Sequence, residues 1–170
     1  SASPLVSRSR FANCKTGVFL EHLGSPDVRN CVFYQCQTAL GNNRQGLTSD
    51  LRDPGAIVER CAFISNSRGV VGQALVRDSI FLGNSTGMRL SNFHYRYSTK
   101  IDHVALRSNL FHDNSADIEG DTGLDNDPVH GAPQFAGPLA KLADPGVTLP
   151  PCLKLGSSSP ARLRATDGGD

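Results

Sequence analysis

The side chains best suited to chemistry gather in one short stretch of the chain, residues 94–103. This stretch combines aromatic, imidazole and cationic side chains, namely His94, Tyr95, Arg96, Tyr97, Lys100 and His103. Aromatic faces stack on sugar rings, and cations pair with carboxylates. Such a set can bind an acidic polysaccharide, with Tyr95, Tyr97 and Arg96 as substrate-binding residues. An exposed polar loop with its aromatics tucked against the fold would have the same composition, and that alternative stays open.

A repeat that runs through residues 4–120 must position this stretch. Five phenylalanines spaced by 22, 30, 18 and 30 residues mark the copies of the repeat: Phe11, Phe33, Phe63, Phe81 and Phe111. When the copies are aligned on these residues, each column of the alignment keeps one chemical character. Apolar residues come in alternating pairs, such as Ala56 and Val58, which indicates short strands. A unit this short suits three strands and three bends, which make one coil of a parallel β-solenoid. The sequence therefore predicts an all-β fold of about five coils, with like columns stacked about 4.8 Å apart.

Two long insertions interrupt the repeat at the same corner of the coil. One is residues 42–55, and the other includes the stretch 94–103. The coil between them has no such insertion, so two walls and a low coil predict a groove at residues 70–73. Loops on a rigid scaffold commonly frame binding sites. We therefore add three residues of these walls and this floor to the predicted substrate-binding set: Arg44, Arg52 and Gln73.

The repeat resembles the right-handed parallel β-helix of the pectin-lyase-like superfamily. Three stretches carry the resemblance: Val28 to Phe33, Val76 to Met88, and Leu106 to Phe111. After residue 120 the repeat stops, and Pro133, Gln134 and Phe135 with the later Leu153 to Ala161 resemble the segment that ends many bacterial secreted β-helix proteins. The resemblance implies a helix domain at 1–120, an irregular C-terminal cap at 121–170 packed on the last coil, and an extracytoplasmic or secreted location.

The resemblance also implies a chemistry. In the resembling lyases a base takes the proton beside a uronate carboxyl group, while Arg or Lys, frequently with calcium, neutralises that carboxylate. The candidates for these catalytic roles are Lys100, Arg96, His94 and His103. Three carboxylates beyond the repeat are candidates for binding calcium, which prefers oxygen ligands: Asp121, Asp125 and Asp127.

Two columns of small polar residues must find partners inside the solenoid. One holds Ser9, Cys31, Cys61, Ser79 and Asn109, and the other holds Cys14, Cys36, Asn66, Asn84 and Asn114. We expect the asparagines to bond amide to amide along the stack and to adopt the left-handed backbone of the bends. We expect the cysteines to form a buried, reduced ladder, although stacked neighbours are close enough for a disulfide. Outside, a charge ladder should place Glu59 between Arg29 and Arg77, with Arg107 in the same column.

The composition of the chain limits the kinds of binding partner that we expect. The net charge is +1, which indicates no nucleic-acid partner. No apolar run is long enough to span a membrane, and no Cys-x-x-Cys motif indicates zinc.

Three functions follow as expectations. The first is a β-helix domain that binds polysaccharide or serves as a surface module, within a larger protein. The second is a polysaccharide lyase acting on uronic-acid polymers. The third is a structural module that self-associates, or joins an upstream domain, through an open N-terminal end, because a solenoid end without a cap exposes strand edges.

Overall fold

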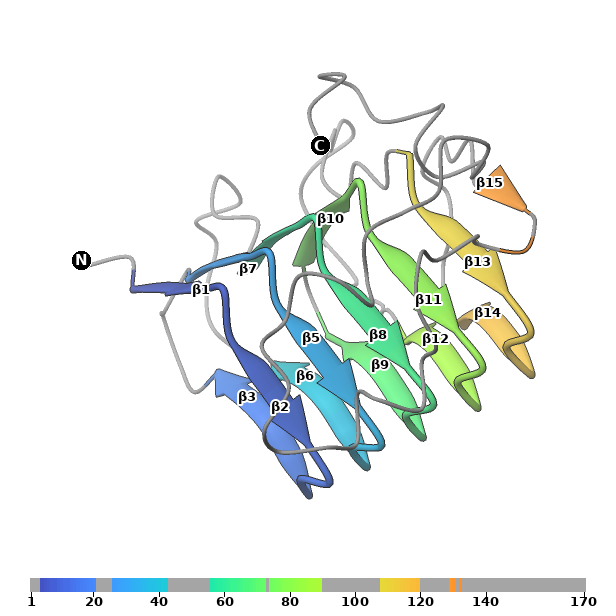
Figure 1. Cartoon of the computed structure of the whole chain (residues 1–170), viewed down its shortest axis with the longest axis horizontal. Helices are drawn as coiled ribbons and strands as arrows, with labels where there is room; N and C mark the ends of the chain where they lie inside the picture. Colours follow the sequence, from blue (N-terminus) through green and yellow to red (C-terminus); the bar gives the residue numbers. More distant parts are fainter. Residues whose placement is uncertain are drawn as a thin grey trace, which may run out of the picture.

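The computed structural model describes residues 4–20, 26–42, 56–72, 74–89, 108–119, 129–130 and 132. Within these ranges it contains fifteen short strands and no helix (Figure 1). Sheet A comprises β1 (Leu5–Ser7), β4 (Asp27–Arg29), β7 (Ala56–Glu59) and β10 (Ala74–Arg77). Sheet B comprises β2 (Arg10–Ala12), β5 (Val32–Tyr34), β8 (Ala62–Ile64), β11 (Ile80–Leu82), β13 (Leu110–His112) and β15 (Val129–His130). Sheet C comprises β3 (Thr16–Leu20), β6 (Thr38–Asn42), β9 (Arg68–Val71), β12 (Thr86–Arg89) and β14 (Ala116–Glu119).

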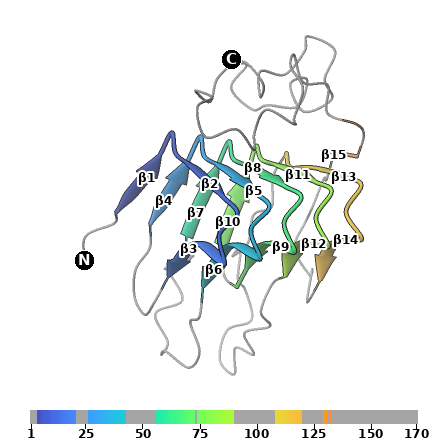
Figure 2. The ribbon, with the colours of Figure 1, turned by 60° about the horizontal axis from the view of Figure 1, so that its bottom comes forward.

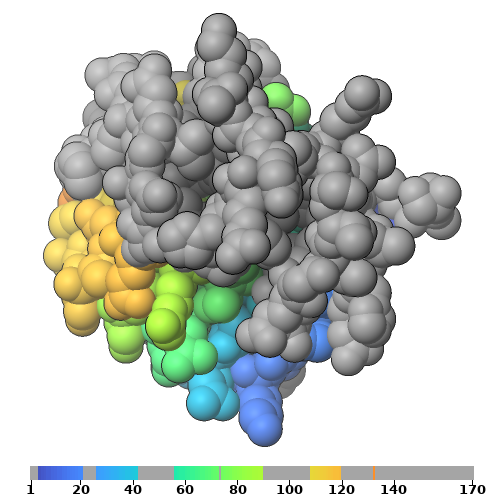
Figure 3. Space-filling view, turned by 180° about the vertical axis from the view of Figure 1, so that it is seen from behind, coloured from blue at the N-terminus to red at the C-terminus, as the bar shows by residue number. Residues whose placement is uncertain are grey.

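The chain visits sheets A, B and C in turn, and each strand pairs in parallel with its counterpart one coil further on (Figure 2). The register follows the sequence columns: Val28 lies opposite Val58, Phe33 opposite Phe63, and Leu40 opposite Val70. These three parallel sheets confirm the predicted right-handed parallel β-helix of about five coils. Seen from behind, the described coils follow one another in sequence order across the surface (Figure 3).

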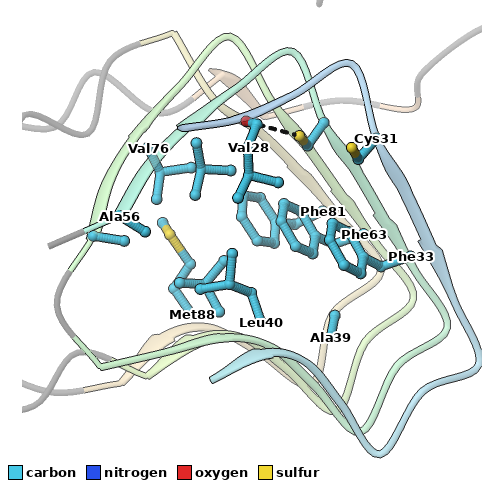
Figure 4. Close-up of a cluster of buried hydrophobic side chains, with 14 of the residues drawn as sticks. Val28, Cys31, Phe33, Ala39, Leu40, Ala56, Phe63, Val76, Phe81 and Met88 are labelled. Carbon is cyan, nitrogen blue, oxygen red and sulfur yellow. Dashed lines mark hydrogen bonds between the residues drawn. The ribbon is translucent and has the colours of Figure 1, made fainter. Parts of the chain in front are cut away.

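The core is a bundle of stacked columns that runs along the inside of the coils (Figure 4). Successive Phe rings lie nearly parallel, with centroids 4.7–5.0 Å apart from Phe11 through Phe111. Phe33, Phe63 and Phe81 are completely buried. Burying each ring stabilises the fold by about 2–3 kcal/mol. A side chain at Gly69 or Gly87 would clash with a carbonyl oxygen of the next coil, so these two positions require glycine.

The backbone conformation of the ladder asparagines differs from the prediction. The ladder residues Asn66, Asn84 and Asn114 do not adopt positive φ. The left-handed residues are instead those immediately before the two polar columns, with φ between 49° and 62°: Arg8, Asn30, Arg60, Asp78, Ser108, Asn13, Gln35, Ser65, Gly83 and Asp113. Most of these are exposed, whereas the ladder residues that follow are mainly buried. The left-handed position thus takes an outward side chain, and the next residue turns inward.

The third corner, between sheets C and A, is where the insertions leave. β9 lies between β6 and β12 in sheet C, so the two long insertions start from strands that flank β9, as predicted. Residues 43–55 and 90–107 themselves lie outside the described ranges. Of the predicted C-terminal cap, the structure describes β15 and Ala132; β15 continues sheet B beyond the fifth coil, with Val129 opposite Leu110.

Candidate functional site

None of the predicted site residues falls within the described ranges. This holds for the proposed sugar-binding and catalytic residues and for the proposed calcium ligands: Arg44, Arg52, Gln73, His94, Tyr95, Arg96, Tyr97, Lys100, His103, Asp121, Asp125 and Asp127. Their roles stay predictions. Arg107 of the charge ladder also lies outside these ranges. The described floor of the predicted groove is β9 and the bend after it, where the Gly72 N–H donates to the Arg89 carbonyl oxygen at 2.9 Å.

The outer face of sheet C carries an exposed aromatic ring. Phe19 is 53% exposed, and its ring lies beside Gly41, where a side chain would come within 3.4 Å of it. Two exposed cations, Arg68 and Arg89, stand on the same sheet. Val71 continues the row from Phe19 and Gly41 towards Arg89. This row combines an aromatic ring with the guanidinium group of Arg89, which lies 3.8 Å from Glu119 Oε2.

The charge ladder on sheet A forms as predicted among the described residues. Glu59 lies between two guanidinium groups, with Arg29 Nε 3.4 Å from its Oε2 and Arg77 Nη2 in contact with its Oε1. Arg29 also bonds Asp27 at 2.9 Å. The Glu59 side chain is 9% exposed, whereas both arginine side chains are more than 40% exposed. Compensated charges of this kind hold neighbouring coils together.

The asparagine column forms a continuous buried ladder. Asn66 Nδ2 donates to Asn84 Oδ1 at 3.0 Å, and Asn84 Nδ2 donates to Asn114 Oδ1 at 2.8 Å. Each Oδ1 also accepts a backbone N–H of the preceding coil, as from Cys36 to Asn66 at 2.8 Å. Each Nδ2 donates in addition to a Phe carbonyl oxygen of that coil, as from Asn84 to Phe63 at 2.9 Å. The predicted amide-to-amide ladder is confirmed.

The first-bend column follows the same rule with other side chains. Cys61 N–H donates to Ser79 Oγ, and Ser79 N–H donates to Asn109 Oδ1, both at 3.1 Å. The thiols of Cys31 and Cys61 reach back to the carbonyl oxygens of Val6 and Val28, both at 3.5 Å. Side chains in both columns therefore point towards the N-terminal end of the solenoid. Sequence spacing identifies the columns but carries no signal for this direction.

The stacked thiols of Cys31 and Cys61 differ in acidity although their environments look alike. Both residues are free and buried. Hydrogen bonding with the Cys61 side chain is the main influence that lowers the pKa of the Cys31 thiol to about 7, against the opposing effect of burial. Burial, followed by the same bond, raises the pKa of Cys61 well above its ordinary value. In the other column, burial raises the pKa of Cys36.

The first coil is the least covered part of the core. Its inward residues Val6, Phe11 and Val18 are only half-buried, whereas their counterparts on the second to fourth coils are fully buried. Strands β1, β2 and β3 each pair on one side only within the described residues. Ser9 Oγ donates to Ser7 O at 2.9 Å, and Cys14 Sγ donates to Ala12 O at 3.4 Å, both within their own coil.

Other site types find no support among the residues that the structure describes. These residues contain no group of three or more His, Cys, Asp or Glu side chains placed to hold a metal ion. They also contain no helix long and apolar enough to cross a membrane.

The fold defines the class of protein as a parallel β-solenoid. Comparison of the chain with protein-family models, with curated proteins and with solved structures finds no match in any of the three. Function must therefore be argued from the described surface itself.

Proposed function

We propose that the chain is a structural assembly module whose first coil accepts a further β-solenoid coil. One observation carries the proposal: the edges of β1, β2 and β3 end the three sheets, and the half-buried Phe11 ends the Phe stack. Open strand edges are templates for pairing with another chain. A solenoid coil buries its apolar face only when a neighbour stacks on it.

The polarity of the ladders supports a coil that runs in the same direction. In every stacked pair the inward side chain of one coil accepts an N–H from, or donates to a carbonyl of, the preceding coil. Ser9 and Cys14 present the same groups at the open end. A coil that arrives in parallel offers them N–H and carbonyl groups at matching positions, whereas a second first coil facing this one would offer more side chains of the same kind.

The partner that best fits this requirement is a second copy of the chain, stacked head to tail. Its own repeat presents the same columns, so a Phe of the incoming coil can extend the stack beyond Phe11. Head-to-tail stacking is heterologous, and a heterologous interface that does not close produces open chains. We therefore expect growth of oligomers along the solenoid axis.

Light scattering over a wide range of protein concentration tests the proposal. The average mass should rise with concentration, and hydrogen exchange should slow in β1, β2 and β3 as it does so. Val18→Lys places a charge on the inward column of the open end and should abolish the rise. Thr16→Lys adds the same charge to an exposed position of the same strand and should leave the rise intact.

A monomer at every concentration would overturn the proposal, as would concentration-dependent protection confined to other strands. Circular dichroism checks that Val18→Lys is folded. If that variant does not fold, the exchange pattern of the unchanged chain decides the question alone.

The second candidate is a polysaccharide-binding surface, favoured by the exposed Phe19 and by two exposed arginines of sheet C, Arg68 and Arg89. The predicted sugar-binding residues Tyr95 and Tyr97 belong to an insertion that follows a strand of this sheet. Gel retardation by acidic polysaccharides should weaken when Phe19 becomes Ala, and weaken further when both tyrosines become Ala. Unchanged retardation in all these variants would contradict this candidate. Absorbance of unsaturated uronates in the same mixtures would distinguish a lyase from a binding surface.

A further inference from the structure

We infer that the outer face of sheet B is the docking surface of the chain's own C-terminal segment, residues 133–170, which crosses the second to fifth coils as a strap. The inference concerns the side of the solenoid. It does not depend on the proposed stacking at the first coil, and it differs from a cap that covers only the end of the last coil.

The outer face of sheet B is apolar, although it points away from the core. Phe33, Phe63 and Phe81 point inward (Figure 4), and strand alternation turns the residues on either side of each Phe outward. One outer column holds Val32, Ala62, Ile80 and Leu110, and the other holds Tyr34, Ile64, Leu82 and His112. Parallel strands that are apolar on both sides are typical of sheets covered on both faces.

These outward side chains are almost inaccessible to solvent. Val32, Ile64 and Leu110 are 3%, 2% and 0% exposed, respectively. Ile57 of sheet A and Val71 of sheet C point outward on the same coil as Ile64, and each also has a paired strand on either side, yet both are only partly buried. Neighbours within a sheet therefore do not bury an outward side chain to this extent, and a further layer of protein must cover sheet B.

The described residues do not supply this layer. Sheets A and C enclose the core on the inner side of sheet B, and no described strand lies on its outer side (Figure 2). The burial arises within a single copy of the chain. The cover is therefore a part of this same chain that lies outside the described ranges.

The points at which the chain leaves the coils identify that part. Residues 21–25 and 43–55 connect sheet C to sheet A, and residues 90–107 leave sheet C at the same corner, opposite sheet B. Residues 120–128 connect β14 to β15. Residues 133–170, by contrast, follow β15, which belongs to sheet B itself. They are the longest of these segments and the one that starts beside the face to be covered.

The composition and length of residues 133–170 suit this face. Large apolar residues recur along the segment: Phe135, Leu139, Leu142, Val147, Leu149, Leu153, Leu155 and Leu163. The distance from the fifth coil to the second is three steps of about 4.8 Å, or about 14 Å, which about five extended residues span. On the first coil the outer column changes to Arg10, and we place the limit of the strap there. The strap thus adds an apolar link between coils that is separate from the inward columns.

Photo-crosslinking in the whole chain tests the inference. Benzoylphenylalanine, a photoreactive aromatic residue, replaces Tyr34 on the outer face of sheet B. Light should link it to peptides from residues 133–170, which mass spectrometry identifies after trypsin digestion. The matched control carries the same residue in place of Phe19, the exposed ring of sheet C, and should give no such link. A mixture of isotope-labelled and unlabelled chains distinguishes links within one chain from links between copies.

The inference is overturned if position 34 links to another segment, links to a second copy, or gives no link in the folded chain. Circular dichroism checks that the variant is folded. If it is not, Leu82 provides a second site for the probe in the same outer column, two coils further on.

A charge placed under the strap gives an independent readout. Ile64→Glu should speed trypsin cleavage after Lys141 and Lys154 by about tenfold while the coils stay uncut, because cleavage follows the population of the released segment. Ile57→Glu places the same charge on the partly buried outer face of sheet A and should leave these rates unchanged. Equal cleavage rates in the two variants would contradict the strap.

Discussion

The two halves of the solenoid fill the same inward positions with different chemistry. On the early coils the second-bend column holds Cys14 and Cys36, and on the later coils it holds Asn66, Asn84 and Asn114. The hydrogen bonds made by the Asn side-chain amides of the later half are 2.8–3.1 Å long. The thiol contacts of the early half in this column are 3.4–3.6 Å long. The backbone therefore dictates where a small polar residue stands, and the side chain decides how firmly it joins the coils.

The amide and thiol side chains also differ in how strongly they join neighbouring coils. A buried amide has two donors and an acceptor that must all be satisfied, so Asn66 and Asn84 each bind both neighbouring coils. A thiol is a weak donor and acceptor that packs like a small apolar residue. The early half thus contains weaker links between coils, and the open end of the solenoid belongs to it.

Truncating the asparagine ladder should cause the largest loss of stability. Asn84→Ala removes the acceptor for the Asn66 amides and the donor to Phe63 O and Asn114 Oδ1. Buried groups left without partners cost about 1–3 kcal/mol each, so we expect a loss of about 3 kcal/mol in the free energy of unfolding. Cys36→Ala, the same truncation in the early half, should cost about 1 kcal/mol. Urea denaturation followed by circular dichroism measures both, and equal losses would contradict the comparison.

Most of the architecture could be predicted because in-register stacking turns sequence columns into spatial columns. Phe33, Phe63 and Phe81 align in the sequence repeat, and the same three residues lie opposite one another in the parallel register. The amide ladder follows from the same alignment. The left-handed positions could not be found this way, because their side chains point outward and can be Arg, Gln, Ser or Asp without a common signal. Nor does spacing reveal which of two stacked thiols has the lower pKa.

The candidate site was far less predictable than the coils. Residues such as Tyr95 and Arg44 belong to insertions that lack the repeat, so no column constrains their positions. The predictions for them rest on side-chain chemistry alone. Phe19, by contrast, lies within a coil, and its place in the column after Val18 would have identified it as an outward aromatic residue.

Extending the asparagine ladder into the early half should produce a smaller, opposite effect. In Cys36→Asn, the new Oδ1 can accept the Cys14 N–H, and the new Nδ2 can donate to Phe11 O and to Asn66 Oδ1. These are the contacts that Asn makes on the third and fourth coils. We expect a gain of about 1.5 kcal/mol in the free energy of unfolding. Cys36→Ser, which is too short to make the amide contacts, is the control; a loss of stability in Cys36→Asn would mean that the early coils are built for thiols.

The smallest expected effect is a pH dependence that arises from Cys31 on the second coil. The folded-state pKa of Cys31 is about 7, below its ordinary value of 9.0. A lowered pKa adds stability that is present above the unfolded pKa and is lost as pH falls through the folded value. The stability of the chain relative to Cys31→Ser should therefore be flat below pH 7 and rise by up to about 1 kcal/mol between pH 7 and 8. Cys61 stays protonated in both states over this window, because its pKa is raised on folding. Cys61→Ala removes the S–H donor and should abolish the rise, whereas Asn84→Ala should leave it in place. Urea denaturation at closely spaced pH values measures the difference, and a flat profile in the unchanged chain would show that the two stacked thiols are equivalent.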